Sequence, residues 1–153
     1  MGLDMLQKDK ELLLKDLCSR LPYGVKCAIF NKDLGFGGIS GFEGKYPFVI
    51  DGITQEGDDI DVWLEHGNFS LETVKPYLFP FSSMTEEQYE NFIIISGWDG
   101  DIEDIRRGKF SCMGYIGLDY IYDTIDWLNK NQFDYRGLIP KGLANDATGL
   151  NIY

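Results

Sequence analysis

The sequence is poor in the residues that build the commonest catalytic and metal centres. It contains one histidine, His66, and three cysteines without a CxxC pair. Ser-His-Asp and Cys-His catalysis would both depend on His66, which precedes a glycine at the end of a predicted strand, where a structural or exposed histidine is the simpler interpretation. A zinc site would need nearly every candidate ligand from distant segments. We therefore predict no catalytic residue, metal or cofactor, and we favour a protein that is not an enzyme.

Long apolar runs are also absent. The longest, such as residues 92–95, fall far below the about 20 residues that a helix needs to cross a bilayer. The first eleven residues lack the apolar core of a signal peptide, and an odd number of cysteines indicates reduced thiols. These features predict a cytoplasmic protein without a membrane role.

Positive charge is scarce. Lys and Arg total 14 against 25 Asp and Glu, which gives a net charge of -11. Such a chain is repelled by phosphate backbones, so we expect no direct nucleic-acid binding. The acidity suits a basic protein partner or mimicry of nucleic acid, although it also serves solubility alone.

Two local patterns resemble ligand-binding loops but do not complete them. The glycine-rich residues 34–44 would need glycine at position 40 to match a dinucleotide-binding loop, and serine stands there. The acidic segment that begins at Asp99 lacks the glycine and the glutamate that a calcium loop requires at its sixth and twelfth positions. Pairs such as Asp58 and Asp61 arise by chance in so acidic a chain. The patterns indicate a flexible turn and a solvated acidic turn.

The order of the predicted elements indicates an α+β fold. Residues 4–20 carry leucines at helical spacing, with Asp4 as the N-cap and Pro22 and Gly24 at the end. We expect this helix, then a small antiparallel sheet or partly open barrel, then a helical C-terminal part, all in a single domain over residues 1–153. The expected parts are a strand-rich region 24–80, a mainly helical region 83–144 and a loosely held tail 145–153.

Signals in the second half predict helices with short connections. Thr85 and Gln88 form a capping-box pattern, which predicts a helix over about 86–95. Apolar spacing predicts another helix over 118–130. Residues 109–116 are expected to form a strand, and residues 135–139 a helical turn that Pro140 interrupts. These predictions complete the helical part of the α+β fold.

Trp63 is the first candidate for a partner-binding surface. Ile60, Val62 and Leu64 alternate with polar residues in the predicted strand 60–65, which is the period of a strand with one wet face. Trp63 falls on the wet side between Asp61 and Glu65. An exposed tryptophan there is typical of an interface anchor, whereas the alternative is a second core covered by a helix.

Three segments carry a resemblance to a known family: residues 15–27 (KDLCSRLPYGVKC), 75–88 (KPYLFPFSSMTEEQ) and 126–144 (DWLNKNQFDYRGLIPKGLA). Together they resemble uncharacterised small cytoplasmic proteins of gut-type bacteria and their phages and prophages. The resemblance implies a mobile-element origin and no activity. In the last segment, Tyr135 and Arg136 are either fold-stabilising residues or a second candidate partner surface.

We conclude from the sequence that a non-enzymatic interaction or accessory protein, bound to another protein through an acidic and aromatic surface, is the leading function. The alternative is a small-molecule binder or metal-dependent enzyme that uses carboxylates. A second alternative is an acidic nucleic-acid mimic, which would need carboxylates spaced along one face like phosphates. The candidate partner surface comprises Asp61, Trp63, Glu65, Tyr135 and Arg136.

Overall fold

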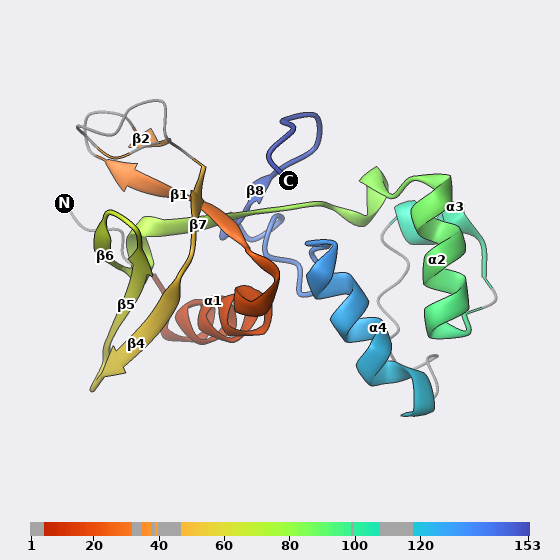
Figure 1. Cartoon of the computed structure of the whole chain (residues 1–153), viewed down its shortest axis with the longest axis horizontal. Helices are drawn as coiled ribbons and strands as arrows, with labels where there is room; N and C mark the ends of the chain where they lie inside the picture. The colour runs from red at the N-terminus through yellow and green to blue at the C-terminus, as the bar shows by residue number, and fades with distance from the viewer. Residues whose placement is uncertain (1–4, 32–34, 38, 40–46, 99, 108–117) are drawn as a thin grey trace. The chain divides into compact units, whose positions relative to one another are not determined.

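The structure is a computed structural model that confirms the α+β class. It divides into two compact units, which are described separately (Figure 1). The first unit comprises Met1–Leu78 and Arg136–Tyr153, and the second comprises Phe79–Tyr135. The single domain over residues 1–153 stays a prediction. The residues that the structure describes are 5–31, 35–37, 39, 47–98, 100–107 and 118–153.

Helix α1, Gln7–Arg20, is the N-terminal helix that the leucine spacing predicted. Leu13 and Leu17, one turn apart on that stripe, are fully buried. The N-cap is Leu6, whereas the predicted cap, Asp4, lies outside the described residues. The stripe of leucines therefore places the helix correctly, with a start three residues later than expected.

Proline and glycine end this helix as predicted. The 3-10 turn η1, Leu21–Tyr23, contains Pro22, and Gly24 follows it with a φ of 68°. This left-handed conformation is accessible to glycine because glycine has no Cβ. The chain then turns into the first strand.

A mixed five-stranded sheet forms one part of the first unit. Its strand order is β2-β1-β7-β8, and β3 also pairs with β1. The pairs of β1 are antiparallel, whereas β7 and β8 are parallel, with Tyr77 opposite Asn145. The predicted antiparallel sheet thus gains one parallel pair from a distant segment. The strands are β1 (Lys26–Asn31), β2 (Gly35–Phe36), β3 (Phe48–Val49), β7 (Val74–Leu78) and β8 (Asn145–Asp146).

Strand β7 lies inside this sheet although it contains Pro76, which cannot donate a backbone hydrogen bond. Pro76 lies opposite Cys27 of β1. The pairing with β8 involves only Tyr77 and Leu78. The proline therefore lies before the ladder to β8 begins, which explains why an interior strand tolerates it.

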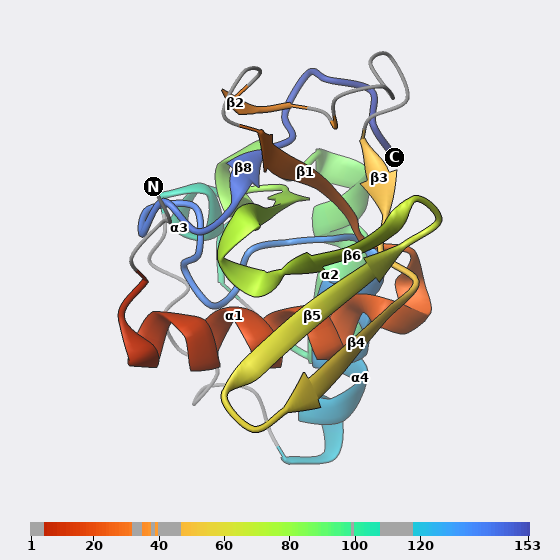
Figure 2. The same ribbon diagram turned by 90° about the vertical axis from the view of Figure 1, so that its left-hand side faces the viewer.

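A separate antiparallel meander comprises β4 (Gly52–Glu56), β5 (Asp59–Leu64) and β6 (Gly67–Ser70). Figure 2 shows β5 between the other two strands. Gly57 closes the first turn with a φ of 62°, a conformation that suits glycine. The 3-10 turn η2, Leu71–Thr73, connects β6 to β7. The strand predicted over residues 60–65 is confirmed as β5.

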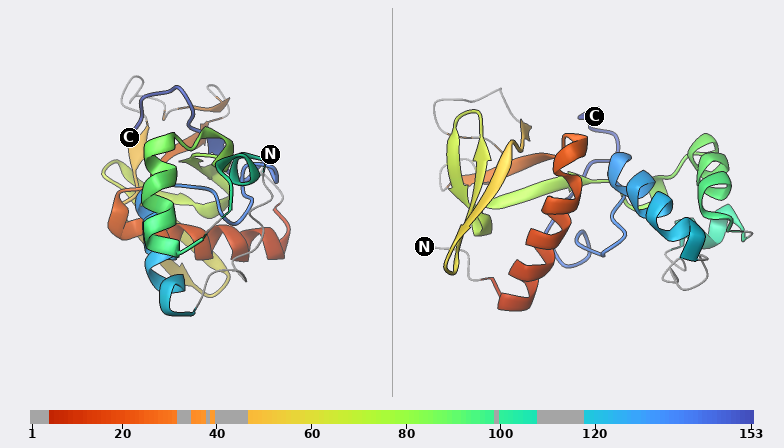
Figure 3. Two further views of the ribbon diagram at one scale, coloured as in Figure 1. Left: turned by 90° about the vertical axis from the view of Figure 1, so that its right-hand side faces the viewer. Right: turned by 60° about the horizontal axis from the view of Figure 1, so that its bottom comes forward.

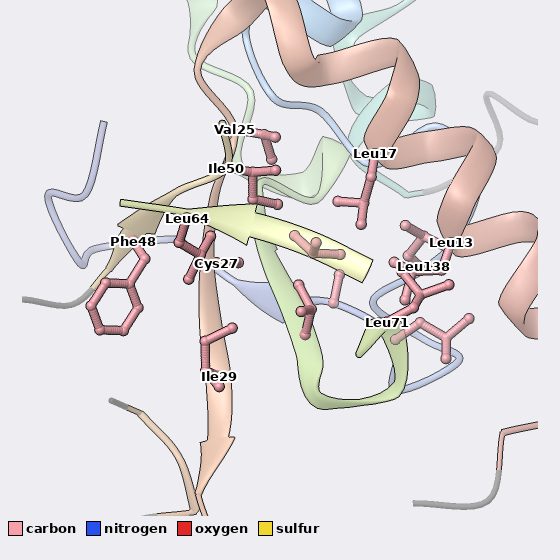
Figure 4. Close-up of a cluster of buried hydrophobic side chains, with 14 of the residues drawn as sticks. Leu13, Leu17, Val25, Cys27, Ile29, Phe48, Ile50, Leu64, Leu71 and Leu138 are labelled. Atoms are coloured by element: carbon pink, nitrogen blue, oxygen red, sulfur yellow. The ribbon is translucent and has the colours of Figure 1, made fainter. Parts of the chain in front are cut away.

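The core of the first unit lies between α1 and the sheets (Figure 4). Leu13 and Leu17 point from α1 toward side chains of the strands. Val62 of β5 is fully buried in the same cluster, so the alternation predicted for this strand is confirmed. Burying one such side chain contributes roughly 1.5–3 kcal/mol, and this cluster accounts for the packing of α1 on the sheets.

The tail 145–153, predicted to be loosely held, is attached to the first unit. The Tyr153 hydroxyl accepts a hydrogen bond from the Lys26 backbone N–H at 2.9 Å and donates one to the Tyr77 carbonyl at 2.8 Å. Lys26 Nζ lies 5.5 Å from the centroid of the Tyr153 ring. These contacts and the β7–β8 pairing hold the tail in place. They also provide hydrogen-bond partners for the Lys26 N–H of β1 and the Tyr77 carbonyl of β7.

The described residues of the second unit form three α-helices, of which α2 and α4 pack against each other. Figure 3 shows α2 in green and α4 in blue. The capping box is present: Gln88 N donates to Thr85 Oγ1 at 3.1 Å, and Thr85 N donates to Gln88 Oε1 at 2.9 Å. The short helix α3 occupies a segment that was predicted to be a turn. The elements are η3 (Phe81–Ser83), α2 (Glu86–Ser96), α3 (Ile102–Arg106) and α4 (Leu118–Lys130).

Aromatic rings build the core of this unit. Phe133 is fully buried and stacks on Phe81, with centroids 5.8 Å apart, and on Trp127, with centroids 5.6 Å apart. Phe92 of α2 lies 5.7 Å from Trp127. Offset aromatic pairs of this kind add about 0.5–1.5 kcal/mol each beyond the area they bury. Phe133 therefore joins η3 to α4.

Two predictions for the C-terminal half are not confirmed. The strand over 109–116 lies outside the described residues. Residues 135–139 form no helix: the chain makes a turn there, in which Leu143 N donates to Leu138 O at 2.9 Å. Pro140 has no N–H to continue a helix, and Gly142 adopts a φ of 74°. The segment from Arg136 onward joins the first unit, so the mainly helical region ends earlier than expected.

Candidate interaction surface

The outer side of the β4–β5–β6 meander is acidic. Ile60, Val62 and Leu64 of β5 are buried, so the residues between them point to the opposite side. Directly paired residues of neighbouring strands share a side of the sheet, and the register therefore adds the outward residues of β4 and β6. We call this surface the acidic face; it comprises Thr54, Glu56, Asp59, Asp61, Trp63, Asn68 and Ser70.

Trp63 is the one large apolar side chain of the acidic face. It is 43% exposed, so the alternative of a second core covering it is wrong within the first unit. Its indole Nε1 donates a hydrogen bond to Thr54 Oγ1 at 2.8 Å. Its direct partners across the strands are Gly52 and Asn68, which are small and cover little of the ring. The ring is thus held in place while much of its surface stays in water.

Negative charge surrounds this tryptophan. Asp61 lies between Thr54 and Ser70 in the register, and Asp59 lies opposite Glu56. Residues 52–70 contain five acidic residues and no Lys or Arg. Lys10 of α1 lies within electrostatic range of Asp58 and Asp59, which contribute to raising its pKa after the larger effect of its bond to Glu72. The meander itself supplies no cation to neutralise the acidic face.

A cavity of about 180 Å³ lies where β5 ends. Its charged groups are the exposed carboxylates of Asp51 and Glu65, and its apolar walls include Phe48, Val49 and Leu64. A hollow with an apolar wall and carboxylates suits a cationic side chain with an aliphatic stem.

His66 also lines this cavity, and it packs edge-on against Phe48 with ring centroids 5.4 Å apart. It is half-buried, where the sequence had predicted a structural or an exposed histidine.

Tyr135 and Arg136 have partners within the chain. The Tyr135 hydroxyl donates to Asn129 Oδ1 at 2.9 Å. Arg136 is 17% exposed, and its Nη1 donates to Oδ1 of the fully buried Asp16 at 2.9 Å. Arg20 also bonds Asp16, with Nε 2.9 Å from Oδ2 and Nη2 3.1 Å from Oδ1. Arg136 therefore stabilises the first unit, and it is a poor candidate for contact with a partner.

Among the described residues there is neither a three-ligand metal cluster nor a thiol with a lowered pKa. No group of three His, Cys, Asp or Glu among them could hold a metal ion. Burial raises the pKa of the Cys27 thiol to about 12, and it also raises the pKa of Cys18. Both thiols are held away from the reactive thiolate form. Asp99, Cys112 and most of the glycine-rich loop lie outside the described residues.

The alternation of β5 predicted that Asp61, Trp63 and Glu65 lie on the wet side of the strand, but it did not predict how wide the acidic surface is. The sequence did contain a signal for this width, which is the distribution of charge. Residues 46–74 contain seven acidic residues and no Lys or Arg. Asp51 at the cavity was also missed. Its part in the cavity depends on β3 and β5 meeting, which the order of residues alone does not specify.

Comparisons with known proteins add no family to this description. The chain matches no family model, no curated protein and no solved structure.

Within the described residues, none of the helices has the length and apolar character needed to cross a membrane.

Proposed function

We propose that this chain is a non-enzymatic interaction protein that binds a basic segment of another protein through the acidic face. The observation that carries the proposal is Trp63, which is 43% exposed and held by Thr54 among carboxylates that no cation of the meander neutralises. An accessory role in a bacterial mobile element stays a prediction from the resemblance.

The chemistry of this surface suits Arg and Lys. A cation over an exposed tryptophan ring contributes about 0.5–1 kcal/mol, and more when it is desolvated. Asp59 and Asp61 add attraction that brings a basic segment to the surface and fixes its orientation. The cavity beside Asp51 and Glu65 adds a second position for a cationic side chain. Binding of this kind weakens with salt, because exposed charges are screened over about 10 Å at 0.1 M ionic strength.

The proposal is tested with an arginine-rich peptide and the ¹⁵N-labelled full chain. Titration should move the indole N–H signal of Trp63, assigned with Trp63→Phe, and the shifts should saturate. Trp63→Ala should weaken binding about fivefold, which corresponds to ~1 kcal/mol. Tyr122→Ala is the matched control, because it removes an aromatic ring that is 79% exposed in the second unit.

The paired substitution Asp59→Asn with Asp61→Asn should also weaken binding and reduce its salt dependence. Asp123→Asn with Asp126→Asn, at two exposed acids of α4, is the control for the loss of two charges. Equal binding by wild type, Trp63→Ala and the double variant would refute the proposal, since it would show that the peptide binds elsewhere on the chain.

The same titration separates the other two functions. A nucleic-acid mimic uses its carboxylates, so binding would fall in the double aspartate variant and stay unchanged in Trp63→Ala. A carboxylate-based metal binder would show a rise in melting temperature with Mg²⁺ or Ca²⁺ and no response to the peptide. Asp51 and Glu65 at the smaller cavity are the carboxylates on which this last function would depend.

A further inference from the structure

A second cavity in the first unit has a different charge. Its volume is about 270 Å³, and it shares no lining residue with the cavity at the end of β5. Elements from four parts of the chain meet around it: the start of α1, β2, β7 and the turn before β8. We call it the lysine pocket; the residues that define it are Met5, Phe36, Val74, Lys75, Lys141 and Leu143.

Two lysines line this pocket in a chain that has few cations. Lys75 Nζ lies 5.2 Å from the centroid of the Phe36 ring, so the ring holds the ammonium group beside the pocket. Lys141 is exposed in the turn before β8. Among the described residues, neither lysine has a carboxylate within ion-pair distance. Both ammonium groups can therefore bind an anion.

The acidic residues of the pocket limit the charge of that anion. Glu72 is paired with Lys10 of α1, so this pair contributes little net charge. Asp9 remains as one carboxylate against Lys75 and Lys141. Together Lys75, Lys141 and Asp9 carry a net charge of +1, which an anion with one negative charge neutralises.

The walls of the pocket favour an apolar body on the ligand. Met5, Phe36, Val74 and Leu143 supply aliphatic and aromatic surface beside the two ammonium groups. Its volume lies just below the roughly 300 Å³ at which cavities for drug-sized ligands begin, so the ligand is small. We infer that the lysine pocket binds a small monocarboxylate that carries an apolar chain, with the carboxylate at Lys75 and Lys141 and the chain against Val74 and Leu143.

This inference is independent of the proposed function, and one probe tests it. Octanoate added to the ¹³C-methyl-labelled full chain should produce saturable shifts of the Met5, Val74 and Leu143 methyl signals and raise the melting temperature. Octylamine matches its chain and reverses its charge, so it should bind at least tenfold more weakly. Inorganic phosphate has no apolar chain and should cause no saturable shift of these methyl signals.

Variants make the test specific. Lys75→Met and Lys141→Met should each weaken octanoate binding about tenfold, whereas Lys130→Met, at an exposed position of α4, should not change it. Asp9→Asn should tighten binding, because it removes the opposing carboxylate. Trp63→Ala should leave octanoate binding intact, which separates this pocket from the acidic face.

Three results would overturn the inference. They are octanoate shifts that do not saturate, equal binding of octanoate and octylamine, and unchanged binding in both lysine variants with melting temperatures like that of wild type. If either lysine variant failed to fold, Lys75→Arg and Lys141→Arg would keep the charge, and retained octanoate binding in both is then expected. Loss of binding in these two folded arginine variants would contradict a role for the positive charge.

Discussion

Asp16→Asn should strongly destabilise the first unit. The Asp16 carboxylate is fully buried and accepts three hydrogen bonds, two from Arg20 and one from Arg136. The asparagine amide has almost the same shape, but its NH₂ group would face a guanidinium donor and its charge is zero. Arg20, which is also fully buried, would then lose the negative charge of Asp16 beside its guanidinium group.

Removing one partner of a buried ion pair costs about 3–5 kcal/mol, because the other charge stays buried without compensation. We expect a loss of that size in the free energy of unfolding. Arg136→Met should cost less, since Arg136 is 17% exposed and Asp16 keeps both bonds from Arg20. Glu11→Gln, at an exposed position of α1, should change the free energy by less than about 0.5 kcal/mol.

Urea titration followed by NMR measures these effects. The indole N–H signal of Trp63 reports on the first unit, and those of Trp98 and Trp127 report on the second. Asp16→Asn should move the Trp63 transition to much lower urea concentration. A loss below about 1 kcal/mol would refute the reasoning, since it would mean that water or a neighbouring group compensates Arg20.

Two further predictions concern the helix cap and alkaline pH. Thr85→Ala should lower the free energy of unfolding reported by Trp98 and Trp127 by about 1 kcal/mol, because it removes the acceptor for Gln88 N, whereas Thr85→Ser should change it by a few tenths. Stability should also fall as pH rises from about 9 toward 12: burial raises the pKa of Cys27 from 9.0 to about 12, so in this window the folded state binds a proton that the unfolded state has lost. The contribution of this thiol to the slope of the free energy of unfolding against pH reaches about 1.4 kcal/mol per pH unit. Urea titrations of wild type and Cys27→Ala at several pH values should therefore show a shallower decline in the variant.

The elements that were predicted correctly are those whose signals are local. The leucine stripe of α1, the capping box of Thr85 and Gln88, and the alternation of β5 each depend on residues within one or two turns or on adjacent pairs. Packing on the rest of the fold reinforces these preferences, so the short-range pattern and the final structure agree.

The features that were missed depend on contacts between distant segments. β8 is only two residues long, and nothing in Asn145–Asp146 indicates a strand until β7 lies beside it. Arg136 finds Asp16 across 120 positions of the chain, and the Tyr153 hydroxyl reaches Lys26 across 127. The wet face around Trp63 could be predicted from the alternation of β5, whereas the cavity at Asp51 requires knowing which strands meet.

The distribution of charge along the chain bears on whether the acidity serves solubility alone or the proposed binding. Solubility requires a net charge and is served best when both signs are interspersed. At the average spacing of the chain's 14 Lys and Arg, residues 46–74 would carry about two or three of them, yet they carry none beside seven acidic residues. The meander within this segment places an exposed tryptophan among those acids. Such segregation strengthens attraction to a cationic partner at a defined place, and it does nothing for solubility that mixed charges would not do better.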